Sequence, residues 1–85
     1  RGPAAKRKII HDFSMLPVIA PDLDDHIAAA ELGNRCRRKG VQVGTIDALL
    51  ARLCIHHELA LLTTDRDFTD MARHCPLDVV DAGSS

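Results

Sequence analysis

The chain of 85 residues has no Trp, no Tyr and only two Phe, so its apolar side chains are mostly Ala, Val, Ile and Leu. Side chains of this size bury a modest area each. At about 25 cal/mol per Å² of apolar surface, they predict a core of marginal stability. The length suffices for one small domain. We therefore expect a single domain that gains stability when another chain covers it.

Signals for disulfides and for membrane spans are also lacking. Cys36, Cys54 and Cys75 are an odd number without C-x-x-C spacing, so the sequence predicts no disulfide framework. This suits a reducing cytoplasm, where we expect the protein to reside. No apolar run approaches membrane-spanning length and no signal peptide is evident. Because the first residue is Arg1 rather than Met, we expect the chain to be part of something longer.

Positive and negative charges nearly balance in this sequence. The formal net charge of −1 excludes a general electrostatic attraction of the whole molecule to nucleic acid. The charges are clustered, with basic runs at residues 6–8 and 35–39 and an acidic group of Asp22, Asp24 and Asp25. These clusters favour a solvated surface, and the alternative is a basic face that binds RNA phosphate.

What the sequence does contain is an alternation of helix and strand patterns. The folded part is predicted to span residues 9–80, between a frayed segment at 1–8 and a tail at 81–85. The predicted helices are the end of one at 6–16, one at 22–39, one at 46–57 capped by Thr45, and a short turn at 69–74. The predicted strands are 16–20, 59–63 and 77–80, with a polar loop at 64–68. This alternation predicts an α/β fold with a parallel sheet.

Apolar residues recur on one face of each long helix. In the first helix, Ala28, Leu32 and Cys36 are four residues apart, and Gly40 is a natural residue to follow its C-terminal end. The buried face of the second is predicted to consist of Ile46, Leu49, Leu50, Leu53 and Cys54.

Carboxylates lie at the ends of these elements. Asp47 is in the first turn of a predicted helix, and Asp65 and Asp67 follow a predicted buried strand. Ligand sites in parallel sheets gather beyond the carboxyl ends of strands. Converging carboxylates suit a hard cation such as Mg²⁺ or Mn²⁺. In the alternative interpretation, Asp47 interacts with the helix dipole and the other two form a loop.

Four segments carry a resemblance to a known family. They are LPVIAP at 16–21, RRKG at 37–40, TIDALLA at 45–51 and LLTTDRDF at 61–68. Their order and spacing resemble the second half of a VapC-type PIN domain. The resemblance implies a PIN-like three-layer α/β/α fold with a parallel sheet, of which this chain supplies the C-terminal part. It also implies a metal-dependent endoribonuclease that hydrolyses RNA phosphodiesters with Mg²⁺ or Mn²⁺, as the toxin of a VapBC-type toxin–antitoxin system.

The resemblance also implies roles for individual residues and partners. Asp47 and Asp65 would be the third and fourth acidic residues of the metal site, and Asp67 an accessory carboxylate. Thr63 matches the small hydroxyl residue that supports the site. The implied partners are an RNA substrate and a cognate antitoxin.

One departure from the family pattern concerns its first aspartate and its glutamate. Both belong before the matched region, and nothing between Arg1 and Phe13 fits either motif. We therefore expect the chain to hold only part of the metal site and to be inactive alone. A second polypeptide with the N-terminal half, or a second copy of the chain in a homo-oligomer, would complete the sheet. The alternative is a cleaved or degenerate PIN fragment that only dimerises or binds the antitoxin.

The remaining residues have competing interpretations. Arg52 and Arg66 are candidates for contacts with RNA phosphate, or could neutralise the acidic residues. Phe68 is predicted to fill the core beneath the acidic loop. Adjacent histidines on a helix point about 100° apart, so His56 and His57 are interpreted as surface residues rather than a zinc site.

Overall fold

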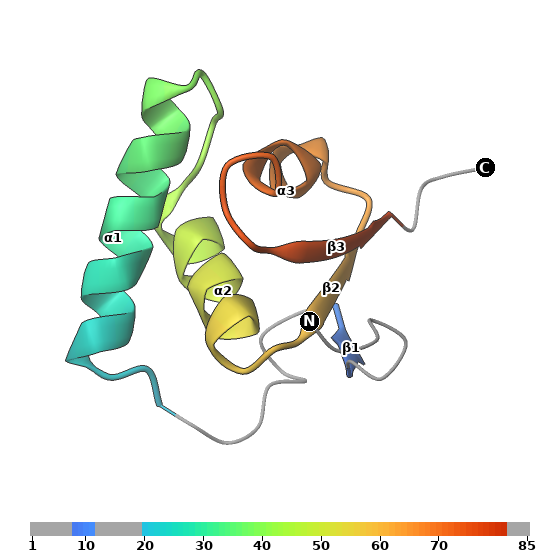
Figure 1. Cartoon of the computed structure of the whole chain (residues 1–85), viewed down its shortest axis with the longest axis horizontal. Coiled ribbons are helices and arrows are strands. Elements are labelled where there is room, and N and C mark those ends of the chain that lie inside the picture. Colours follow the sequence, from blue (N-terminus) through green and yellow to red (C-terminus); the bar gives the residue numbers. More distant parts are fainter. Residues whose placement is uncertain (1–7, 12–19, 82–85) are drawn as a thin grey trace.

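The computed structural model describes residues 8–11 and 20–81. The strands β1 (Ile9–Ile10), β2 (Ala60–Thr63) and β3 (Asp78–Asp81) form a parallel sheet in the order β1-β2-β3. The helices are α1 (Leu23–Arg38), α2 (Thr45–His56) and α3 (Arg66–Met71). Helix α1 packs on α2, which contacts β2, while α3 lies beside β3 (Figure 1). The predicted α/β class with a parallel sheet is confirmed.

Strand β2 lies in the middle of the sheet. It pairs with β3 along its whole length, and Ala60 and Leu61 pair with Ile9 and Ile10 on the other side. The amide of Ala60 donates to the carbonyl of Lys8 over 2.9 Å. Leu61 and its register partner Ile10 are fully buried on one face of the sheet, and Ala60 is buried on the other face of β2, as expected where a parallel strand is covered on both faces.

The position of β1 overturns two expectations. Residues 6–16 were predicted to end a helix, but Ile9 and Ile10 form a strand. Two β-branched residues suit a pleated backbone, and the edge of β2 supplies the hydrogen-bonding partner that a strand needs. At these positions the second neighbour of β2 therefore comes from this chain and not from another polypeptide. Of the predicted strand at 16–20, Ala20 is not in a strand and the rest lies outside the described residues.

Helix α1 begins and ends where its local signals predict. The Asp22 carboxylate accepts from the amide of Asp25 over 2.8 Å, and the Asp25 carboxylate accepts from the amide of Asp22 over 3.2 Å. This reciprocal pair is a capping box and satisfies two amides at the start of the helix. Lys39 caps the other end, and Gly40 follows with φ of 87°, a conformation that favours glycine.

The buried faces of the two long helices differ in detail from the prediction. In α1 the buried apolar residues are Ala29, Leu32 and Cys36, whereas Ala28 is only half-buried. In α2 Ile46 is 63% exposed, because it lies in the first turn at an open hollow between α1 and α2 that His26 and Ala30 also line. The positions buried in α2 are Ala48, Leu50, Ala51, Leu53 and Cys54.

Two helix starts were also predicted incorrectly. Gly44, not Thr45, is the N-cap of α2, so no side chain caps the start of this helix. Helix α3 begins at Arg66 rather than Thr69, because the Asp65 side chain accepts from the amide of Asp67 and so caps the helix early. Within the described residues, no helix is long and apolar enough to cross a membrane.

The core confirms the expected roles of Phe68 and two of the cysteines. Phe68 is buried in the main apolar cluster beneath the start of α3. Cys36 and Cys54 are fully buried and free. Burial raises the pKa of Cys54 to about 11 and also raises that of Cys36, so both remain neutral thiols and pack as small hydrophobic side chains.

The role of β1 can be tested by comparing its two isoleucines. Ile10 is fully buried and Ile9 is half-exposed, so they share a strand but not an environment. Ile10→Ala should lower the free energy of unfolding by about 2–5 kcal/mol in urea titrations, the usual range for a buried isoleucine. Ile9→Ala, the matched control, should lower it by less than half as much. Equal losses for the two variants would show that β1 does not occupy this sheet.

Candidate functional site

The acidic residues of the predicted site lie around a hollow. Asp47 is in the first turn of α2, and Asp67 is in the first turn of α3. Both line a hollow of about 540 Å³, together with Arg37 and residues 40–44. Two helix starts, distant in sequence, therefore present their carboxylates to the same space.

Asp65 is positioned by its neighbours at the end of β2. Its amide donates to the hydroxyl Oγ1 of Thr63 over 3.0 Å, and its carboxylate Oδ1 accepts from the amide of Asp67 over 2.9 Å. The pattern Thr-x-Asp-x-Asp thus forms a local turn from strand to helix. Thr63 holds the backbone of Asp65 in place, which is compatible with the supporting role implied by the resemblance.

The three carboxylates act on one another electrostatically. Burial raises the pKa of Asp47, and the negative charges of Asp65 and Asp67 raise it further. Asp65 and Asp67 are therefore near enough to Asp47 for repulsion. Like charges gathered at one place, with oxygen atoms as the only donors, have the chemistry of a site for a hard divalent cation.

The present arrangement does not complete such a site. Among residues 8–11 and 20–81, no three His, Cys, Asp or Glu side chains form a group that could hold a metal ion. The prediction that Asp47, Asp65 and Asp67 all reach one ion stays a prediction. The donor set fits a divalent cation by its chemistry.

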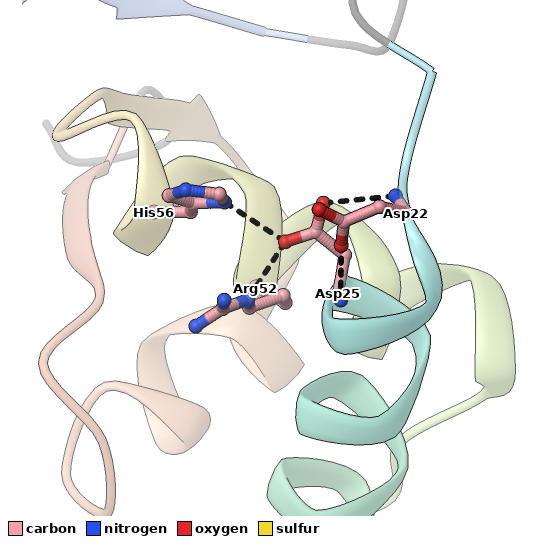
Figure 2. Close-up of polar contacts among 4 residues, drawn as sticks. All are labelled: Asp22, Asp25, Arg52 and His56. Atoms are coloured by element: carbon pink, nitrogen blue, oxygen red, sulfur yellow. Dashed lines mark hydrogen bonds and ion pairs between the residues drawn. The ribbon is translucent and has the colours of Figure 1, made fainter.

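A second cluster of charges joins α1 to α2, and Figure 2 shows its four residues. The Asp25 carboxylate Oδ1 accepts from Nε of Arg52 over 3.0 Å and lies 2.8 Å from Nδ1 of His56. Asp25 is 1% exposed. The interpretation of Asp22, Asp24 and Asp25 as a solvated group is therefore wrong for Asp25, since α2 covers it.

The partners of Asp25 stabilise its charged form. Burial alone would raise its pKa, but the Asp22 amide and then the His56 and Arg52 side chains hold it well below the usual range of an aspartate. Arg52 thus neutralises Asp25 rather than the carboxylates of the hollow. The spacing of Arg52 and His56, four residues apart on α2, indicates a shared helix face that could have drawn attention to a buried acid.

The two histidines are not simple surface residues. The His56 side chain is 43% exposed but contacts Asp25, and its ring stacks on that of His57 with centroids 4.6 Å apart. Nε2 of His57 is buried without a hydrogen-bond partner among the described residues. Arg66, the other candidate for RNA contact, is exposed at the start of α3 between Asp65 and Asp67.

Sequence reasoning missed Arg37 as a residue of the hollow. It was grouped with the surface charges at 35–39, yet it lines the same space as Asp47 and Asp67. The available signal was Gly33, a glycine inside the helix one turn before Arg37. A glycine at such a position indicates that another group lies close to the helix backbone there.

Comparison with protein families decides the assignment. The model of the PIN domain family matches residues 2–74. The chain belongs to the PIN domain family. PIN domains are typically nucleases and generally use divalent metal ions. A search of curated proteins found no significant match.

The Asp25 cluster of this PIN domain predicts a dependence of stability on pH. Because the folded pKa of Asp25 is lowered from 3.8, its charge stabilises the fold above about pH 4, and this contribution is lost as the pH falls further. At pH 7, Asp25→Asn should lower the melting temperature by at least about 4 °C.

The control for this prediction is Asp24→Asn, which changes an exposed aspartate in the same helix turn and should have little effect. The deficit of Asp25→Asn relative to wild type should shrink as the pH is lowered from about 4 to about 2. A deficit that stays constant over this range, followed by thermal melts, would contradict the role of the Asp25 charge.

Proposed function

We propose that this PIN domain is a metal-dependent endoribonuclease of the VapC type, the toxin of a toxin–antitoxin system. The observation that carries the proposal is the hollow that Asp47 and Asp67 both line, with the charge of Asp65, at the end of β2, acting on Asp47. The PIN match supports nuclease activity. The motifs TIDALLA at 45–51 and LLTTDRDF at 61–68 support the VapC type.

In this proposal the carboxylates of Asp47, Asp65 and Asp67 hold Mg²⁺ or Mn²⁺. When bound, such an ion activates water and stabilises the charge on a displaced phosphate oxygen. Asp65 uses Oδ1 to cap α3, so Oδ2 is the atom it would offer as a ligand. Thr63 keeps Asp65 in position through the amide hydrogen bond. Repulsion among the three carboxylates makes a cation at this place favourable.

Mg²⁺ prefers octahedral coordination by oxygen, so three carboxylates leave room for further ligands. One source is a part of the domain outside this chain, in line with the resemblance to the C-terminal half.

The second candidate function is a PIN fragment that only dimerises or binds an antitoxin. The nuclease proposal also includes partners and a location. The partners are an RNA substrate, a cognate antitoxin and a second copy of the chain, and the location is the cytoplasm.

The nuclease proposal predicts that the full-length parent protein, in which the metal site is complete, cleaves RNA with Mg²⁺ or Mn²⁺, whereas this chain alone is inactive. Asp47→Asn and Asp65→Asn should each lower the cleavage rate at least about 100-fold, because Asn keeps the shape but removes the charge that balances the cation. Asp70→Asn, which changes another aspartate of α3 outside the site, is the matched control and should retain activity. Full activity of either site variant, or cleavage in excess chelator, would refute the proposal.

A further inference from the structure

Arg37 is held in a fixed position at the wall of the hollow. Its Nη1 donates to the carbonyl of Val43 over 2.6 Å, and its Nη2 donates to Oδ1 of Asn34 over 2.7 Å. These contacts tie the C-terminal end of α1 to the segment that precedes α2. A long, rotamer-rich side chain is thereby ordered before any ligand arrives.

Gly33 makes room for this guanidinium group. A Cβ atom added at Gly33 would lie 3.1 Å from both Nη1 and Nη2 of Arg37. Glycine inside a helix costs about 1 kcal/mol relative to alanine. Helix α1 therefore carries a destabilising residue at the one position where it lets Arg37 lie against the helix.

The charge of Arg37 is not neutralised within the described part of the chain. Its two hydrogen-bond partners there are a carbonyl and an amide oxygen, and no ion pair joins it to Asp47 or Asp67 among those residues. A guanidinium group has five N–H donors in a planar fork, and these contacts use two of them. The remaining donors suit the oxygens of a phosphate group.

We propose that Arg37 binds a backbone phosphate of an RNA strand in the hollow, next to the carboxylates of Asp47 and Asp67. A fixed cation that lines the same hollow offsets the repulsion between those carboxylates and the phosphate, and so positions the strand. This inference rests on the proposed ribonuclease function, since it names a substrate-positioning residue for the same site. Asn34 and Gly33 act through Arg37, by holding it and by leaving it space.

Binding of a short fluorescein-labelled single-stranded RNA, measured by anisotropy in excess chelator, tests the proposal. Arg37→Ala should raise Kd about tenfold or more. The Kd of Arg37→Lys should lie between those of wild type and Arg37→Ala, because lysine keeps the charge but lacks the planar fork. The matched control is Arg38→Ala, which removes an exposed charge one position away and should change Kd less than about threefold. The slope of log Kd against log salt concentration should fall by about 0.7 in Arg37→Ala. Equal weakening in the Arg37 and Arg38 variants would overturn the proposal.

A second measurement needs no variant, in case Arg37→Ala disturbs folding. Phenylglyoxal modifies exposed arginines, and mass spectrometry of wild-type protein can follow Arg37 and Arg38 separately. Bound RNA should protect Arg37 and leave Arg38 reactive. Equal modification of Arg37 with and without RNA would contradict the proposal.

The outcomes also separate this inference from the nuclease proposal. Binding that depends on Arg37, without any cleavage by the full-length parent protein, would refute the nuclease function and retain the phosphate site. Cleavage that depends on Asp47, with Arg37→Ala binding RNA as well as Arg38→Ala does, would sink only the role of Arg37.

Discussion

The buried carboxylate of Asp25 constrains how α1 and α2 pack, and the hollow depends on that packing. A buried charge without partners is costly, so Asp25 must remain beside Arg52 and His56 of α2 and the Asp22 amide of α1. This contact fixes the N-terminal end of α1 against the C-terminal half of α2 (Figure 2). The opposite end of α1 then lies near the start of α2, where Arg37 and Asp47 line the hollow.

Two groups of aspartates in one small domain show opposite electrostatics. Asp25 has a cationic partner and hydrogen-bond donors, and its pKa is lowered. Asp47 is partly buried near two further carboxylates, and its pKa is raised. The contacts of Asp25 stabilise the folded state, whereas the repulsion of Asp47 by Asp65 and Asp67 destabilises it. Clusters of unrelieved like charge are characteristic of functional sites, because the free energy they cost is recovered when a ligand binds.

Local signals in the sequence predicted much of this fold. The spacing of Leu32 and Cys36 and the position of Gly40 located α1, and the carboxylates at helix starts and strand ends indicated the site. What failed depends on contacts distant in sequence. Strand β1 forms because the edge of β2 accepts it, and Asp25 is buried because its partners lie 27 and 31 residues away. The exposure of Ile46 likewise follows from where α1 and the sheet lie, which helical periodicity does not specify.

The central claim is that Asp47, Asp65 and Asp67 form a site for a divalent cation beside the hollow. The most direct test is nuclear magnetic resonance of ¹⁵N-labelled protein with substoichiometric Mn²⁺, a paramagnetic ion that broadens the signals of nearby amides. The account predicts that broadening begins at residues 43–48 and 63–68, spares residues 22–27, and is lost in Asp47→Asn. Broadening centred on other acidic residues, or unchanged in Asp47→Asn, would contradict it.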